Sequence, residues 1–77
     1  MAEKAMLKDV EKDGEVLLLA DGRRLLVPND EDETVASIWV PPLRLTLRKG
    51  KRGTLNVTNE DTGDTISVTA RGSIDGL

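Results

Sequence analysis

The chain contains no histidine, cysteine, tyrosine or phenylalanine, and it has a single tryptophan. Without histidine and cysteine, the usual nucleophile–base pairs and soft-metal sites cannot be built. With one aromatic residue in all, the chain also lacks the stacking platforms on which many proteins bind single-stranded nucleic acid. We therefore expect a protein that is not an enzyme, with no catalytic residues, no cofactor and no metal site.

The 77 residues are expected to form one small domain, with residues 1–4 and 72–77 frayed. Hydrophobic residues make up 38% of the chain and charged residues 32%, an ordinary balance for a folded, soluble domain. The longest apolar run, residues 16–20, is far too short to cross a membrane. As the sequence stands we expect a cytoplasmic protein, or a secreted or periplasmic one if a leader has been removed.

Apolar and polar residues alternate strictly in three segments of the C-terminal half, residues 43–48, 54–58 and 65–71. This period of two is typical of strands with one buried and one solvated face. The connecting segments, residues 50–53 and 59–64, contain glycine and asparagine, which tolerate the backbone conformations of tight turns. The C-terminal half is therefore predicted to be a three-stranded meander.

The N-terminal half shows a weaker version of the same pattern. Two apolar segments, residues 15–19 and 24–27, flank Asp21-Gly22, which is a strong hairpin signal. Two short strands joined by a tight turn are expected here.

Residues 5–11 precede a second such turn at Asp13-Gly14 and are predicted to be the first strand. The alternative is a short helix over residues 2–12 with Gly14 near its C-cap, because apolar side chains recur four apart in this segment.

An acidic segment in the middle of the chain looks like a helix start. Asn29 or Asp30 can cap it, and the carboxylates that follow lie where the helix dipole favours negative charge. A short helical turn is expected through about Ser37. It must end before Pro41-Pro42, because a proline disfavours the helical conformation of the residue before it.

Five or six short strands with one crossover predict an all-β protein, a small SH3-like barrel with one short helical turn before Trp39, or alternatively an OB-like barrel. Trp39 is expected to be buried at one end of the barrel, with its indole N–H bonded to a backbone carbonyl or placed at the barrel mouth. The predicted core contains one face of each alternating segment: Val16, Leu18, Leu25, Val27, Leu45, Leu47, Leu55, Val57, Ile66 and Val68.

Three turn sequences occur in the order Leu19-Ala20-Asp21-Gly22, Trp39-Val40-Pro41 and Asn59-Glu60-Asp61-Thr62-Gly63. In this order the chain resembles, over residues 15–70, a group of small uncharacterised bacterial β-barrel proteins that carry L-x-D-G, W-x-P and N-x-D-T-G turns. The chain departs from that group in having Pro42 where a glycine is usual, and in lacking an aromatic after the first turn. The resemblance implies a barrel fold and no particular activity.

The net charge of −3 is unevenly distributed. Residues 35–54 carry five basic side chains and no acidic one. The candidate binding surface consists of these basic residues: Arg44, Arg48, Lys49, Lys51 and Arg52. Such a cluster predicts an anionic partner or self-association.

We interpret the chain as a non-catalytic protein-interaction or structural module, whose partner is another protein or a second copy of itself. The alternative is a nucleic-acid-binding barrel that uses the basic hairpin of residues 44–52. Because the chain is acidic overall and has one aromatic residue, nucleic acid is the less favoured partner.

Overall fold

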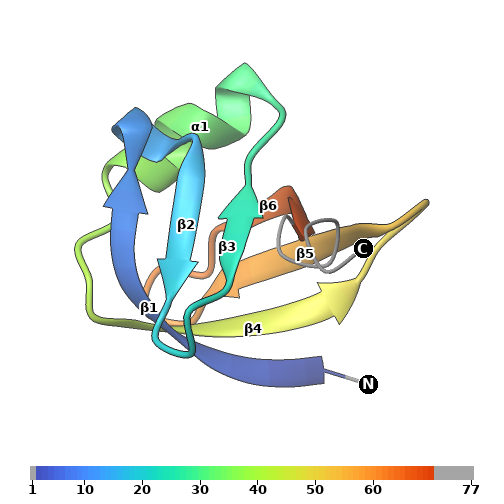
Figure 1. The fold of residues 1–77 in the computed structure, drawn as a ribbon, viewed down its shortest axis with the longest axis horizontal. Helices are drawn as coiled ribbons and strands as arrows, with labels where there is room; N and C mark the ends of the chain where they lie inside the picture. Colours follow the sequence, from blue (N-terminus) through green and yellow to red (C-terminus); the bar gives the residue numbers. More distant parts are fainter. Residues whose placement is uncertain (1, 71–77) are drawn as a thin grey trace.

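The computed structural model describes residues 2–70 and consists mostly of β-strands (Figure 1). The strands are β1 (Ala2–Glu11), β2 (Val16–Leu19), β3 (Arg24–Leu26), β4 (Leu43–Lys49), β5 (Thr54–Asn59) and β6 (Thr65–Ala70). Helix α1 (Asp30–Ser37) connects β3 to β4, and a 3-10 turn, η1 (Lys12–Gly14), lies between β1 and β2. The predicted all-β protein with one short helical segment before Trp39 is confirmed.

The six strands close into an antiparallel barrel in the order β1-β2-β3-β6-β5-β4. Strands β4, β5 and β6 pair in succession, which confirms the predicted meander. Two seams join the halves of the chain. The β1–β4 seam runs from Ala2 opposite Arg48 to Leu7 opposite Leu43. Within residues 2–70 the β3–β6 seam is shorter and pairs residues 25 and 26 with residues 70 and 69.

Strand β1 shows that the alternative of a helix over residues 2–12 is wrong. Residues 2–4, expected to be frayed, pair with residues 46–48 of β4, whereas residues 72–77 lie outside the described part of the chain. The register of β1 shifts between Leu7 and Asp9. Such a bulge bends a strand, and β1 accordingly pairs with β4 along its first part and with β2 along its last.

Both predicted Asp-Gly turns join antiparallel strands. Gly14 has a φ of +100° and Gly22 a φ of +97°, which a glycine adopts without steric cost. Gly14 also lies against α1, because a Cβ atom at this position would be 2.2 Å from the main-chain oxygen of Glu33. A residue without a side chain is therefore required where η1 contacts the helix.

Eight of the ten predicted core residues are buried, and the remaining two, Leu18 and Leu55, are half-buried. In β2 the residues of the main core are Leu17 and Leu19, so the predicted inward face, Val16 and Leu18, is wrong for this strand. The physical reason is that β2 is apolar at all four positions. Without alternating polar residues, the sequence does not define which face points inward.

Trp39 is only 4% exposed and belongs to the main core, so its predicted burial is confirmed. The predicted hydrogen bond of its side chain is not found, because the indole nitrogen Nε1 has no partner among residues 2–70. Trp39 thus contributes apolar area to the core rather than a polar link.

Helix α1 follows Asn29, which occupies the N-cap position without a side-chain capping hydrogen bond. The side-chain amide of Asn29 instead donates to Oδ2 of Asp32 at 3.3 Å. The same carboxylate oxygen accepts a hydrogen bond from the main-chain nitrogen of Ser67 in β6, at 3.1 Å. The first turn of the helix is therefore hydrogen-bonded to the barrel next to the β3–β6 seam.

Candidate binding surfaces

The predicted basic residues lie on the outside of β4 and on the hairpin that follows it. Leu43, Leu45 and Leu47 are buried, so the alternating positions Arg44 and Arg48 face outward and are exposed. At the usual rise per residue these two arginines are about 13 Å apart along the strand. We call the five predicted residues the basic face: Arg44, Arg48, Lys49, Lys51 and Arg52. The structure places four of them in two separate neighbourhoods, and Arg48 lies on β4 between these without lining either hollow.

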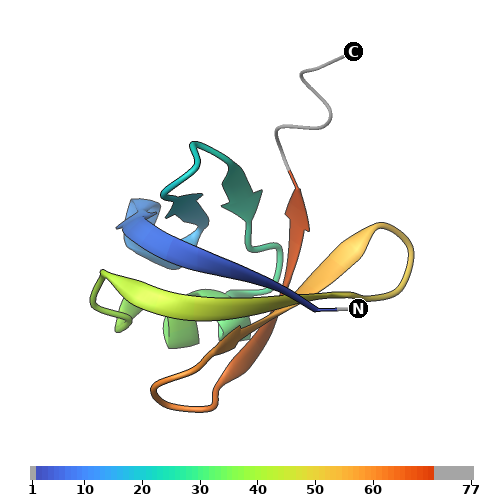
Figure 2. The same cartoon turned by 90° about the horizontal axis from the view of Figure 1, so that it is seen from below.

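The first neighbourhood is at the tip of the β4–β5 hairpin, which extends to one side of the barrel (Figure 2). An open hollow of about 720 Å³ is lined here by the last three residues of the basic face and by polar residues of the adjoining strands. The lining consists of Lys49, Gly50, Lys51, Arg52, Thr54, Asn56 and Ser67. Cations beside hydroxyl and amide groups are suited to the carboxylates of a partner.

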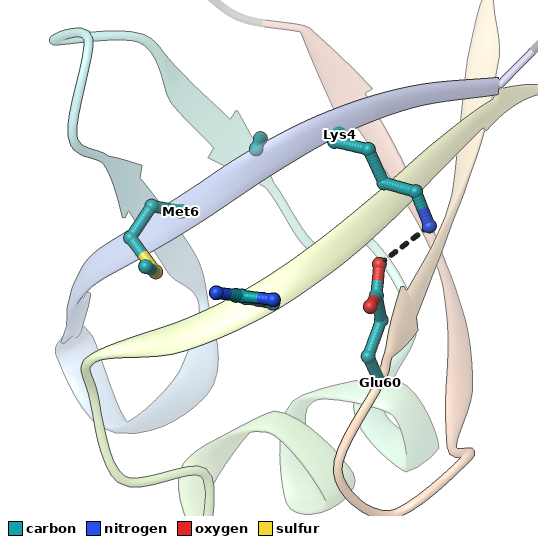
Figure 3. Close-up of a pocket in the computed structure, with 5 residues that line it drawn as sticks. Lys4, Met6 and Glu60 are labelled. Carbon is teal, nitrogen blue, oxygen red and sulfur yellow. Dashed lines mark hydrogen bonds and ion pairs between the residues drawn. The ribbon is translucent and has the colours of Figure 1, made fainter.

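The second neighbourhood, which we call the Met6–Arg44 hollow, lies where β1 and β4 pair (Figure 3). It has a volume of about 380 Å³ and is lined by Lys4, Ala5, Met6, Arg44 and Glu60. Met6 is directly opposite Arg44 in the strand pairing and is 42% exposed. An exposed thioether therefore lies beside a guanidinium group, and the hollow combines apolar and cationic character.

A compact polar cluster forms one wall of the Met6–Arg44 hollow. Lys4 Nζ is 2.7 Å from Oε2 of Glu60, and the hydroxyl of Thr46 donates to the same oxygen at 2.7 Å. The hydrogen bond from Lys4, together with that from Thr46, lowers the pKa of the Glu60 carboxyl below its ordinary value. Glu60 is thus held ionised mainly by Lys4 and Thr46, with a smaller contribution from the charge of nearby Arg44. Arg44 itself forms no ion pair within residues 2–70.

Some cationic side chains form ion pairs, whereas others, including those of the basic face, Lys8 and Lys12, form none within residues 2–70. Lys4, Arg23 and Arg24 each form an ion pair with a carboxylate. Within residues 2–70, no residue of the basic face has such a pair. A cation that is solvated and unpaired can bind an external anion without first breaking an internal contact, so the basic face is available for a partner.

A second candidate surface was not predicted from the sequence. Ile38 and Val40, on either side of buried Trp39, are 72% and 76% exposed. They lie at the edge of a hollow of about 330 Å³, which we call the Ile38–Val40 hollow. Its lining consists of Ile38, Trp39, Val40, Leu43, Asn59, Asp61, Thr62 and Asp64. Two exposed aliphatic side chains therefore lie beside two carboxylates.

The acidic side of the Ile38–Val40 hollow is a well-defined turn. Asn59 is buried, and its Oδ1 accepts a hydrogen bond from the main-chain nitrogen of Asp61 at 2.8 Å. Thr62 donates its hydroxyl to the Asp64 carboxylate at 2.9 Å. The sequence signal for this surface was the run Ile38-Trp39-Val40. Ile38 is the C-cap of α1 and Val40 precedes Pro41-Pro42, so neither neighbour of the buried tryptophan lies in a strand.

The described part of the chain contains no group of three or more acidic residues arranged to hold a metal ion. It also contains no helix with the length and apolar character needed to span a membrane. Comparisons of the chain with protein-family models, curated proteins and solved structures gave no significant match. The resemblance to bacterial barrels with L-x-D-G, W-x-P and N-x-D-T-G turns therefore stays a prediction, and function has to be argued from the two surfaces.

Proposed function

We propose that the protein is a non-catalytic interaction module whose basic face binds an acidic segment of another protein. The observation that carries this proposal is the position of Arg44 beside exposed Met6, in a hollow where the neighbouring Lys4 is already paired with Glu60. A peptide with a carboxylate next to an apolar side chain would satisfy both groups at once. Arg48 and the hairpin cations would extend the same contact along β4.

The mixed character of this surface favours a protein over a nucleic acid. Proteins that bind single strands on a sheet surface stack bases on aromatic side chains. The chain has one aromatic residue, Trp39, and it is buried. The net charge of −3 also opposes approach of a polyanion. An SH3-like barrel remains our fold-family proposal, with an OB-like barrel as the alternative.

The test is a binding titration with a short fluorescent peptide rich in glutamate and leucine, at physiological salt. A peptide with lysine in place of glutamate and a single-stranded oligonucleotide are titrated in the same way for comparison. We expect the acidic peptide alone to bind. The R44E/R48E variant should bind it about tenfold more weakly, which corresponds to about 1.4 kcal/mol.

The matched control is Lys8→Glu, which reverses an exposed charge on β1 that lines neither hollow. It should bind the acidic peptide as the wild type does. Binding of the oligonucleotide with a steep salt dependence, abolished in R48E/K51E, would instead support the nucleic-acid alternative. Binding of neither anionic ligand would contradict the proposal.

A further inference from the structure

The Met6–Arg44 hollow and the Ile38–Val40 hollow share an edge. Arg44 and Glu60 line the first, and their chain neighbours Leu43 and Asp61 line the second. The main-chain nitrogen of Glu60 donates to the oxygen of Arg44 at 3.0 Å, which holds the two chain segments together at this edge. The two hollows therefore lie side by side on the same side of the barrel.

The two hollows are complementary in both charge and polarity. One presents Arg44 without an ion pair among the described residues, together with partly exposed Met6. The other presents Asp61 and Asp64 next to two aliphatic side chains that are more than 70% exposed. Apolar area on each side can be buried against the other, and the carboxylates can pair with the guanidinium group.

We propose that the acidic partner of the basic face includes a second copy of this chain, with the Ile38–Val40 hollow of each copy seated on the Met6–Arg44 hollow of the other. The proposal rests on the proposed function, since it gives that interaction a partner. The contact is made twice, once in each direction. The dimer it forms has a two-fold axis that passes between the two hollows of each copy.

The side-by-side arrangement is the reason for a closed dimer. When complementary patches lie on distant faces, each added copy leaves a free patch, and the assembly grows into a ring or fibre. When the patches are adjacent, a two-fold rotation brings each patch onto its complement and both are covered at once. The hairpin hollow, with Lys49, Lys51 and Arg52, stays outside this contact and remains open to a further partner.

A charge-exchange experiment tests the proposal directly. Arg44→Glu alone and Asp61→Lys alone each place like charges opposite one another at both contacts of a homodimer. Each variant should dissociate at least about tenfold more readily than the wild type in sedimentation velocity. An equal mixture of the two variants should form a dimer again, because both contacts of the mixed pair have opposite charges. Native mass spectrometry should show one copy of each variant.

Two matched controls reverse a charge elsewhere on the surface. Lys8→Glu and Glu31→Lys change exposed residues that line neither of the two hollows, and both should dimerise as the wild type does. If a charge-exchange variant melts below the wild type, I38S/V40S provides an independent test without a change of charge. Its two positions are more exposed than buried, so it should fold normally and lose the dimer.

Several results would overturn the proposal: a wild type that stays monomeric at every concentration, variants that dimerise unchanged, a mixture that fails to restore the dimer, or assemblies that grow beyond two copies. The acidic peptide separates this proposal from the proposed function. A monomeric wild type that binds the peptide defeats the dimer alone. If mixing restores the dimer but the monomeric Asp61→Lys variant does not bind the peptide, the dimer is supported and binding of acidic peptides in general is contradicted.

Discussion

Asp32 in α1 accepts a hydrogen bond from the main-chain nitrogen of Ser67 in β6, with 3.1 Å between Oδ2 and the nitrogen. The contact lies next to the β3–β6 seam, where Leu25 and Leu26 are paired with β6 in the described part of the chain. A main-chain N–H in a barrel needs an acceptor, which a neighbouring strand usually supplies. Here the helix supplies it, so that α1 completes the closure of the barrel where β3 is too short.

This closure can be tested by removing the carboxylate. Asp32→Ala should lower the free energy of unfolding by about 1–2 kcal/mol, because the Ser67 nitrogen loses its partner. Asp32→Asn keeps an acceptor oxygen and should lose less. Urea denaturation at neutral pH measures both. The control is Glu31→Ala, an exposed acidic neighbour, which should stay within about 0.5 kcal/mol of the wild type. Equal losses at residues 31 and 32 would show that the helix is not fastened in this way.

The two glycines of the Asp-Gly turns offer a second matched comparison. Gly14 and Gly22 have nearly the same positive φ, so an alanine at either position carries a similar backbone strain of about 1 kcal/mol. A Cβ at position 22 meets nothing within 4 Å, whereas one at position 14 meets the Glu33 oxygen at 2.2 Å.

Gly14→Ala should therefore destabilise the fold by about 2–4 kcal/mol and Gly22→Ala by about 1 kcal/mol. Thermal unfolding followed by circular dichroism ranks the two variants. A Gly22 variant as unstable as the Gly14 variant would mean that backbone strain alone decides both, and that the approach of η1 to α1 is unimportant.

Two variants of Trp39 distinguish the apolar from the polar contribution of its indole to the free energy of unfolding. Trp39→Ala should cost about 3–5 kcal/mol through lost apolar contacts and the cavity left behind. Trp39→Phe should cost clearly less, because Nε1 has no hydrogen-bond partner among residues 2–70 and its removal leaves no described group unpaired. Chemical denaturation gives both values, and native emission should lie at shorter wavelength than that of free tryptophan. A phenylalanine variant as unstable as the alanine variant would indicate a bonded indole.

Local patterns were sufficient to predict most of this fold. The alternation in β4, β5 and β6 gave the correct inward residues because each apolar position is separated by a polar one. Strand β2 has no such alternation, and its inward face, Leu17 and Leu19, could not be read from four consecutive apolar residues. The bulge between Leu7 and Asp9 was also not predictable, since it is defined by the pairing of β1 with strands distant in the sequence.

The binding surfaces were harder to predict than the fold, because they are formed by segments far apart in the sequence. The residues of the basic face lie within nine positions of the sequence and stay a predicted binding surface, but their separation between two hollows could not be predicted. The Met6–Arg44 hollow joins the first strand to the fourth, and the Ile38–Val40 hollow joins the segment after α1 to the β5–β6 turn. No local pattern relates these segments. Exposure of Ile38 and Val40 follows only once Trp39 is known to occupy the core.

The last prediction concerns pH and the cluster of Lys4, Thr46 and Glu60. Hydrogen bonds from Lys4 and Thr46 lower the pKa of Glu60 in the folded protein, whereas in the unfolded chain it returns to its ordinary value of 4.5. The ionised carboxylate therefore stabilises the fold fully above that value, and the contribution is lost as pH falls through the lowered folded pKa.

Glu60→Gln removes this titration, so the stability of the variant relative to the wild type should be lowest at neutral pH and should recover as the pH falls. Urea denaturation midpoints at neutral and acidic pH measure the difference, with Glu31→Gln, an exposed glutamate that forms no ion pair with residues 2–70, as the control. A difference between Glu60→Gln and wild type that stays constant with pH would show that the Lys4–Glu60 contact does not contribute to folding through its charge.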